Sequence, residues 1–304
     1  EFTSETDSEV IVHLVDSYYA ESEDLLRAVK EAIGRLEGAY AIGVMCCDEP
    51  GRIVAARLGS PLVVGVGIGE HYIASDVLAL RPVTDRFIYL EEGDLVDITA
   101  DALSFWNVED ESVIRTSVRV QAGADEADKG TYRHHMQKEI HEQASVVRRT
   151  LEGRIAAEKV LEAALGVEAS VILDETDSIT LVGCGTSYYA ACVAKYWIEE
   201  MAGISCNVEI ASEFRYRSLV VPPKSLFVTL SQSGETADTL AALRIAEESG
   251  FAHTMTICNV PTSSLARESE LAFLMNAGVE IGVASTKAFT AQLVDLRLLT
   301  ILLA

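Results

Sequence analysis

The sequence predicts an α/β protein with two units, in which an antiparallel sheet packed with helices is followed by a doubly wound parallel sheet. Between residues 39 and 98, short apolar runs alternate with glycine-containing turns, which is typical of antiparallel strands. In the later part of the chain, continuous apolar runs alternate with helical patterns, which is typical of a parallel sheet covered by helices. The length of 304 residues also suits two units better than one.

The first unit is predicted to span residues 1–120. Apolar residues recur at helical spacing from Glu9 to Leu36, and Gly38 is a suitable stop, so one or two helices are expected there. Antiparallel strands are expected at AYAIGVMC, RIVAARL, PLVVGVGI, HYIAS, RFIYL and DLVDITA. Residues 121–131 include the small and acidic run QAGADEADK, which has no apolar period and is predicted to be an interdomain linker.

The second unit is predicted to span residues 132–304 and to begin with a polar helix from Tyr132 to Leu151. The apolar runs SITLVG (Ser178–Gly183) and SLFVTL (Ser225–Leu230) are each predicted to be a strand that leads into a helix. Further helices are expected at Tyr188–Ala202, at Ala237–Ser249 and from Ala288 onward. Ligands of such parallel sheets bind beyond the carboxyl ends of the strands, so the residues after these two runs are the first candidates for a site.

The two strand-to-helix junctions have a similar composition. Cys184, Gly185, Thr186 and Ser187 follow the first strand, and the residues SQSGET (Ser231–Thr236) follow the second. Small hydroxyl side chains beside a glycine allow N–H groups and hydroxyls to converge on one anion at a helix N-terminus. Neither loop has the spacing of a P-loop or a dinucleotide-binding motif, so a phosphate monoester is the predicted ligand. The alternative is that Ser231 or Ser233 is only a helix N-cap.

A third candidate segment is GVASTK (Gly282–Lys287), which lies between a predicted strand and the last predicted helix. Ser285 is assigned to the same pocket as the two loops. Lys287 stays unassigned, because a catalytic amine and an ordinary charged residue that opens a helix both fit the pattern.

Charge and composition exclude several kinds of partner. The 24 basic and 47 acidic residues give a net charge of −23, which repels nucleic acid and anionic lipid surfaces. The sequence contains no apolar run of about 18 residues and begins with a polar, acidic stretch. We therefore expect a cytoplasmic protein with neither a nucleic-acid nor a membrane partner.

No metal site is predicted. The six cysteines show neither metal-ligand spacing nor the density of a disulfide scaffold, so reduced thiols are expected. His134 and His135 are adjacent and would point to different faces of a helix, and His141 adds no partner at a zinc-type spacing.

Longer motifs resemble the isomerase part of the glutamine:fructose-6-phosphate amidotransferase family, also called glucosamine-6-phosphate synthases. These motifs are SQSGETADTL, NAGVEIGVASTKAFT, EIASEFRYR and DKGTYRHHMQKEIHEQ. The isomerase part of the family contains two sugar-isomerase (SIS) domains, and the resemblance implies that the first begins here at about residue 165 and is cut at its end. Residues 1–120 resemble the later half of the family's glutamine amidotransferase type-2 domain, an Ntn-type α+β domain, at SETD, EGAYA, ARLGSPLVVG and ASDVLAL.

The resemblance implies an enzyme that transfers ammonia from L-glutamine to D-fructose 6-phosphate and isomerises the product to D-glucosamine 6-phosphate. This reaction is the first step of hexosamine biosynthesis, and the resemblance implies a homodimer that needs no cofactor. The implied sugar-phosphate ligands are Ser231, Gln232, Ser233 and Thr236, with Cys184, Gly185, Thr186 and Ser187 lining the sugar site and Val283 and Ser285 closing one side. Asp7 of SETD would hold the α-amino group of glutamine, and the alternative is that Asp7 is a helix N-cap.

The sequence also departs from the family pattern. The family's nucleophile is a cysteine at the mature N-terminus, and its general base, ring-opening histidine and Schiff-base lysine belong to the second SIS domain. None of these is matched, so no catalytic residue is assigned in this chain, both ends are interpreted as cuts, and this piece alone is expected to be inactive. The alternative function is a non-catalytic SIS module that binds a phosphosugar as a regulator, which would not need the amidotransferase-like first unit.

Overall fold

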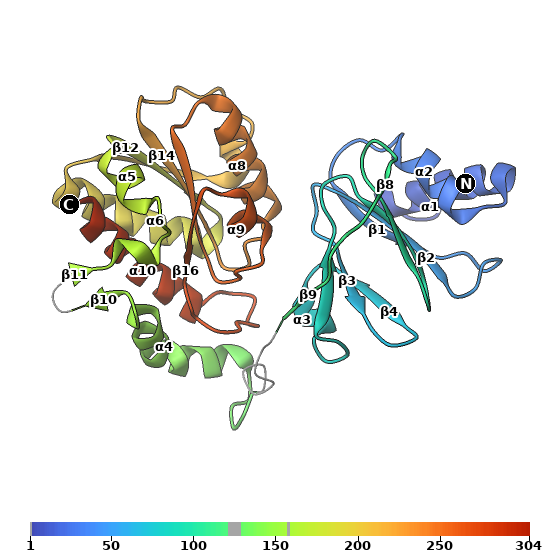
Figure 1. Cartoon of the computed structure of the whole chain (residues 1–304), viewed down its shortest axis with the longest axis horizontal. Helices are drawn as coiled ribbons and strands as arrows, with labels where there is room; N and C mark the ends of the chain where they lie inside the picture. Colours follow the sequence, from blue (N-terminus) through green and yellow to red (C-terminus); the bar gives the residue numbers. More distant parts are fainter. Residues whose placement is uncertain (1, 121–128, 157–158) are drawn as a thin grey trace. The chain divides into compact units, whose positions relative to one another are not determined.

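The computed structural model describes residues 2–120, 129–156 and 159–304, and the chain divides into two compact units, Glu1–Ala122 and Gly123–Ala304 (Figure 1). Most of the predicted linker, residues 121–131, lies outside the described residues. Within the described part of the chain, no helix combines the length and the apolar character needed to span a membrane.

The first unit begins with two helices, α1 (Asp7–Ser22) and α2 (Leu25–Ile33), where the sequence predicts one or two. Its strands are β1 (Tyr40–Val44), β2 (Arg52–Leu58), β3 (Val63–Val66), β4 (His71–Ala74), β5 (Arg86–Tyr89), β6 (Leu95–Thr99), β7 (Leu103–Trp106), β8 (Ser112–Val113) and β9 (Val118–Arg119), and the short helix α3 (Val77–Leu80) follows β4. The strands are antiparallel, as predicted, but they form two sheets, with the orders β1-β2-β6-β7-β8 and β4-β3-β5-β9. The division arises because β2 pairs with β6 and leaves β3, β4 and β5 to the second sheet.

Neighbouring residues of β2 show how the layers of the first unit pack. Val54 belongs to the apolar cluster that includes Val29 of α2, so the two helices cover this face of the first sheet. Ala55 belongs to the cluster that includes Val64 of β3, so the opposite face packs against the second sheet. Successive side chains of a strand point to opposite faces, and burial on both faces explains why β2 is apolar without alternation.

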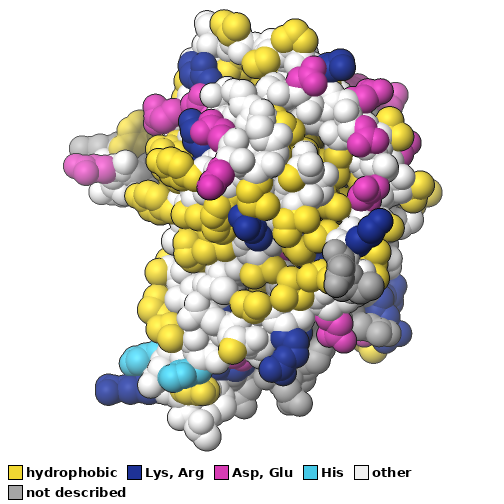
Figure 2. Space-filling view, turned by 90° about the vertical axis from the view of Figure 1, so that its left-hand side faces the viewer, with side chains coloured by type: hydrophobic (Ala, Val, Ile, Leu, Met, Phe, Trp, Pro, Cys, Tyr) yellow, Lys and Arg dark blue, Asp and Glu magenta, His cyan; other side chains and the backbone are white. Residues whose placement is uncertain are grey.

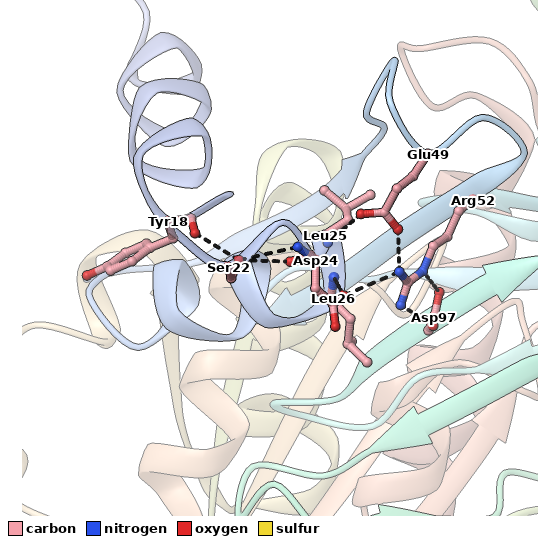
Figure 3. A network of polar contacts seen from close by, with 8 residues as sticks. All are labelled: Tyr18, Ser22, Asp24, Leu25, Leu26, Glu49, Arg52 and Asp97. Atoms are coloured by element: carbon pink, nitrogen blue, oxygen red, sulfur yellow. Dashed lines mark hydrogen bonds and ion pairs between the residues drawn. The ribbon is translucent and has the colours of Figure 1, made fainter. Parts of the chain in front are cut away.

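A polar network joins the turn between α1 and α2 to the first sheet (Figure 3). Asp24 caps α2 by accepting a hydrogen bond from the Leu26 N–H at 3.0 Å. Arg52 of β2 donates two hydrogen bonds of 2.8 Å to the carboxylate of Asp97 in β6, and it also pairs with Asp24 and Glu49. A guanidinium that binds a carboxylate with two parallel bonds fixes orientation as well as distance, so the network sets where α2 begins on the sheet.

The second unit contains one parallel sheet and a small hairpin. Its helices are α4 (His135–Leu151), α5 (Ala169–Asp174), α6 (Gly185–Trp197), α7 (Ala211–Phe214), α8 (Ala237–Ser249), α9 (Ser264–Glu268) and α10 (Lys287–Leu303), with the 3-10 turn η2 (Glu162–Ala164) and the π-helical turn η3 (Ile198–Ala202). Its strands are β10 (Ile155–Ala156), β11 (Lys159–Val160), β12 (Ser178–Gly183), β13 (Ser205–Ile210), β14 (Ser225–Ser231), β15 (His253–Cys258) and β16 (Leu271–Leu274). The parallel sheet has the order β13-β12-β14-β15-β16, and β10 pairs with β11.

Helices cover both faces of the parallel sheet (Figure 1), as expected for a doubly wound fold. Leu181 of β12 packs in a cluster with Ala191 of α6 and Leu296 of α10. The next residue, Val182, packs on the other face in a cluster with Leu243 of α8. The fold class predicted from the sequence is therefore confirmed, with antiparallel sheets in the first unit and a helix-covered parallel sheet in the second.

Apolar side chains also gather on the surface of the second unit. Tyr189 and Tyr196 of α6 are 62% and 71% exposed, and Val171 of α5 is 62% exposed. Figure 2 shows hydrophobic side chains in a broad band across one side of the molecule. Single exposed apolar residues are ordinary, whereas a large group of them is typical of a surface that another domain or chain covers.

Candidate functional site

The two hydroxyl-rich loops lie at the point where the strand order of the parallel sheet reverses. From β12 the chain passes to β13 on one side and then returns to β14 on the other. Loops that leave neighbouring strands in opposite directions open a crevice at the carboxyl ends of those strands, which is where doubly wound folds bind ligands. Gly183 and Leu230 are paired across β12 and β14, so the Cys184–Ser187 and Ser231–Thr236 loops start side by side.

The second loop curls around its own hydroxyl groups. Ser231 is only 3% exposed, and its Oγ accepts a hydrogen bond from the Gly234 N–H at 3.0 Å and lies 3.1 Å from the Thr236 Oγ1. The Ser233 Oγ accepts a hydrogen bond from the Glu235 N–H at 3.1 Å. Thr236 is the N-cap residue of α8, so neither serine has the N-cap position that the alternative reading required.

Thr236 itself makes no capping hydrogen bond with its side chain. The first N–H groups of a helix have no partner within the helix, and a polar group or ligand must satisfy them. The hydroxyl of Thr236 and the first turn of α8 therefore offer donors for an anion, and the helix dipole favours negative charge at the same place.

Contacts with α9 hold this loop in its shape. Gly234 has a φ of +69°, and a Cβ at this position would lie 2.1 Å from the Oγ of the buried Ser263. The Gly234 carbonyl accepts a hydrogen bond from the Leu265 N–H, and the Glu235 carboxylate accepts one of 2.8 Å from the Ser264 N–H. The glycine is therefore required by both the backbone conformation and the close approach of α9.

The first loop belongs to the first turn of α6. The helix begins at Gly185, which is earlier than the predicted start at Tyr188, so Thr186 and Ser187 lie in its first turn. Cys184 is the N-cap residue and is half-buried. The buried Ser187 accepts a hydrogen bond of 2.8 Å from Gln292 of α10, so the last helix holds the first turn of α6 in place.

The third candidate segment precedes α10. Val283 is fully exposed, and Ser285 is half-buried with an Oγ that is shielded from solvent and has no hydrogen-bond partner among the described residues. The segment is linked to the first loop only indirectly, because α10 follows it and carries Gln292. The structure thus brings the two strand-end loops together. Val283 and Ser285 lie in the separate segment that precedes α10.

Lys287 fits neither alternative in its simple form. It is the first residue of α10, but it is only 3% exposed, and its Nζ donates a hydrogen bond of 2.6 Å to Glu142 of α4. Burial raises the pKa of Glu142, but the hydrogen bond and the charges of Lys287 and Lys138 outweigh it, and the net pKa lies below its ordinary value. The amine of Lys287 is therefore committed to a structural ion pair.

Asp7 belongs to the first unit. It is exposed and is the first residue of α1, while Thr6 is the N-cap, so the reading of Asp7 as an N-cap is wrong. Glu9 gathers the preceding residues, since its carboxylate accepts hydrogen bonds from the backbone N–H and the hydroxyl of both Thr3 and Ser4. These bonds, led by the one from the Ser4 hydroxyl, lower the pKa of Glu9 to about 2.

A cavity of about 540 Å³ lies beside α1, between this helix and β1. Ser8, Asp16, Tyr19 and Cys46 are among its lining residues, and Asp7 is not. The cavity is mainly apolar, with residues such as Ile11, Val15 and Ile42 in its wall.

One group of possible metal ligands occurs in the described part of the chain. The ligand atoms of Cys46, Cys47 and Asp48 lie within 4.8 Å of one another, which the spacing of cysteines in the sequence did not indicate. Cys47 and Asp48 are exposed, and three consecutive residues do not supply the four-ligand shell of a structural zinc site. All six cysteines are free, with Cys206 and Cys258 buried.

Three buried polar residues near the site were missed from the sequence: Glu139, Glu280 and Gln292. Each is at most 7% exposed, and each binds a residue of a candidate loop or of the first turn of α10. Glu139 lies within the motif DKGTYRHHMQKEIHEQ, of which only the histidines were considered as possible ligands. No local signal in the sequence identifies these residues, because Glu139 and Gln292 bind partners more than 100 residues away along the chain.

Comparisons with known proteins agree with this geometry. Residues 172–302 match the SIS domain family. Glutamine–fructose-6-phosphate aminotransferase (isomerizing) of Pseudomonas aeruginosa is 58% identical over 300 residues, which cover 99% of this chain and 49% of the relative. The same enzyme of Pseudomonas putida is 57% identical over 302 residues, again 99% of this chain and 49% of the relative. This chain is a homologue of these aminotransferases and contains a SIS domain.

The chain spans about half the length of the curated relatives that it matches. The solved C-terminal domain of glucosamine-fructose-6-phosphate aminotransferase from Francisella tularensis is similar with a TM-score of 0.56 and 52% identity, over 57% of this chain and 49% of that one. The SIS domain of this chain begins at α5 and ends within α10, so α4 and the β10–β11 hairpin precede it.

Proposed function

We propose that this chain is part of an enzyme that transfers ammonia from L-glutamine to D-fructose 6-phosphate and isomerises the product to D-glucosamine 6-phosphate. In this proposal the SIS domain binds the sugar phosphate. The homology with the aminotransferases of two Pseudomonas species supports the assignment, and the antiparallel first unit is a feature that a phosphosugar-binding regulator would not need.

The observation that carries the proposal is the arrangement of Ser231, Ser233 and Thr236 around Gly234 at the N-terminus of α8. We propose that this loop binds the phosphate group through its hydroxyls and N–H groups, with Gln232 as a further ligand. Hydroxyl and N–H donors at a helix start match a phosphate monoester without a lysine. Cys184, Gly185, Thr186 and Ser187 are proposed to line the sugar, and Val283 and Ser285 to close one side.

Two further parts of the proposal rest on the homology. Asp7 at the start of α1 is proposed to hold the α-amino group of L-glutamine. The apolar band of the second unit (Figure 2) is proposed to be covered in a cytoplasmic homodimer.

Calorimetric titration of the whole chain with D-fructose 6-phosphate tests the phosphate site. Hydrogen bonds to a charged group contribute roughly 1.5–3 kcal/mol each, so Thr236→Ala is expected to weaken binding by about ten-fold to a hundred-fold. The melting temperature should fall only slightly, because the Thr236 side chain makes no capping bond and loses only its contact with the Ser231 Oγ. Equal affinities of wild type and Thr236→Ala would refute the pocket.

Thr300→Ala serves as the matched control. Its hydroxyl is buried in α10 and donates to the Leu296 carbonyl at 2.7 Å, far from the N-terminus of that helix. This variant is expected to lower stability and to leave the sugar-phosphate affinity unchanged.

A further inference from the structure

The segment between β16 and α10 has no regular structure of its own, and side chains of α4 bind its main chain. Thr150 donates a hydrogen bond of 2.9 Å to the Met275 carbonyl, and Arg149 donates one of 3.0 Å to the Ala277 carbonyl. Further along, Glu139 accepts hydrogen bonds from two N–H groups of the segment. Buried main-chain groups need partners, and here a helix outside the SIS match provides them.

Glu139 binds the start of the third candidate segment. Its side chain is 2% exposed, and its Oε1 accepts hydrogen bonds of 2.7 Å from the Ile281 N–H and 3.0 Å from the Gly282 N–H. A carboxylate that accepts two N–H bonds makes stronger bonds than a neutral acceptor would. Burying a carboxylate costs free energy, so the buried Glu139 carboxylate indicates that the loop at Ile281 and Gly282 must be held in a fixed conformation.

Glu139 lies so close to the loop that the residue facing it, Gly282, has little room for a side chain. A Cβ on Gly282 would lie 2.5 Å from the Glu139 Oε2. This second carboxylate oxygen is buried and has no hydrogen-bond partner among the described residues. A side chain at position 282 would therefore require either the loop or the buried Glu139 carboxylate to shift.

A second carboxylate closes the other end of the loop. Glu280 is 7% exposed, and its Oε1 accepts hydrogen bonds of 2.9 Å from the Thr286 N–H and 3.0 Å from the Ala288 N–H. Residues 281–286 are thus held at one end by Glu139 and at the other by Glu280. This held segment includes the fully exposed Val283 and the half-buried Ser285.

The same face of α4 also holds the start of α10. Glu142 and Gln143 follow Glu139 by three and four residues, and they bind Lys287 at 2.6 Å and Thr290 at 2.7 Å. Residues three and four apart share one side of a helix. The contacts of α4 therefore continue from the loop into the first turn of α10.

We propose that Glu139 is a positioning residue for the sugar-phosphate site. It holds residues 281–286 in the conformation that lets Val283 and Ser285 close the pocket. The helix α4 therefore contributes to the site, although it precedes the SIS domain. This inference rests on the proposed function, because the pocket must bind a phosphosugar for its closure to matter.

The test compares Glu139→Ala, Glu139→Gln and Thr150→Val in the whole chain. Thr150→Val removes a bond from the same helix to the same segment, but at Met275, away from Val283. Glu139→Ala is expected to weaken binding of D-fructose 6-phosphate by about ten-fold or more, which corresponds to about 1.4 kcal/mol, while inorganic phosphate binds as in wild type. Glu139→Gln keeps a neutral acceptor and should give an intermediate loss. Thr150→Val should lower stability alone.

A merely structural role predicts a different pattern. In that case Glu139→Ala and Thr150→Val would lower stability and leave the affinity for the sugar phosphate the same, and the proposal would be overturned. If Glu139→Ala does not fold, the comparison of Glu139→Gln with Thr150→Val decides by the same criterion.

Hydrogen exchange of a peptide that covers Ile281 and Gly282 separates this inference from the proposed function. Faster exchange in Glu139→Ala than in Thr150→Val is expected if Glu139 orders the loop, and equal exchange overturns the inference. If wild type binds inorganic phosphate but not D-fructose 6-phosphate, the proposed function fails, and the role of Glu139 in closing a sugar pocket fails with it.

Discussion

The side-chain amide of Gln292 in α10 donates a hydrogen bond to the hydroxyl of Ser187 in α6, with 2.8 Å between the two atoms. Both side chains are buried, at 1% and 8% exposure. The contact joins the first turn of α6, which carries one of the candidate loops, to the helix that follows the third candidate segment. It is a buried polar contact between two helices, so each partner depends on the other for its hydrogen bond.

Ser187→Ala is expected to lower the free energy of unfolding by about 1–3 kcal/mol, because it leaves the buried amide of Gln292 without its acceptor. Urea unfolding measures the change. The exposed Ser249 at the end of α8 is the matched control, and Ser249→Ala should change stability by no more than about 0.5 kcal/mol. Adding Gln292→Leu to Ser187→Ala should cost less than the sum of the single changes, and strict additivity would contradict the pairing.

Gly234→Ala is expected to destabilise the second unit and to distort the hydroxyl loop. The new Cβ would meet the buried side chain of Ser263 at 2.1 Å, in addition to the strain of a φ of +69°. Gly250 is the matched control, since it has a φ of +89° but no atom within 4 Å of its added Cβ. Gly250→Ala isolates the backbone cost of roughly 1–2 kcal/mol, and Gly234→Ala should cost clearly more. Equal losses in thermal unfolding would show that the contact with α9 is not what requires the glycine.

The positions of the two strand-end loops were predictable because their signals are local. SITLVG and SLFVTL are apolar apart from one serine and one threonine each, since both faces of β12 and β14 are buried, and each run ends at small hydroxyl residues before a helix. Parallel strands bring their carboxyl ends to one edge of a sheet, so two such junctions indicated one site. The extra strands β7 to β9 and the division of the first unit into two sheets depend on which strands pair, and no local pattern reports that.

The buried polar residues that hold the candidate loops were not predictable, because their partners lie far away in the sequence. Glu139 and Gly282 are 143 residues apart in the sequence, and Ser187 and Gln292 are 105 apart. The sequence predicts α4 only as a polar helix, because Val146 is the one apolar residue among those it buries, and the other two are Glu139 and Thr150. A buried polar face has the same composition as an exposed one, and only the tertiary contacts distinguish them.

Because of the ion pair between Glu142 and Lys287, the free energy of unfolding is expected to change with pH in the acid range. Although burial raises the Glu142 pKa, the bond and charge of Lys287 bring the net value below the ordinary 4.5. A carboxyl whose pKa is lowered by folding stabilises the fold above its unfolded value, and this contribution disappears as the pH falls through the folded value. The stability difference between wild type and Glu142→Gln should thus be largest above pH 4.5 and shrink below it.

Urea unfolding at a series of pH values measures this difference, and Glu109→Gln is its control. Glu109 is exposed, so this variant should follow wild type at every pH. A difference between wild type and Glu142→Gln that stays constant down to about pH 3 would contradict the linkage between the ion pair and folding.

The cysteines are expected to react with an alkylating reagent in an order set by burial. Cys206 is 1% exposed, and burial raises its pKa to about 12, while burial also raises the pKa of the fully buried Cys258. The thiolate is the reactive form, so both thiols should be modified only when the second unit unfolds. Cys47 is exposed and should react first, although the negative charge of Asp48 raises its pKa above the ordinary 9.0.

Peptide mapping after timed exposure to iodoacetamide distinguishes these thiols. Below its pKa, the thiolate fraction of Cys47 rises about ten-fold for each pH unit, so its rate of modification should rise in the same proportion. Asp48→Asn removes the nearby charge and should make Cys47 react faster at neutral pH, while leaving Cys206 and Cys258 protected. Cys47→Ser should abolish the fast phase. Modification of Cys206 in the folded chain as fast as that of Cys47 would contradict both its burial and the packing of β13 against α6.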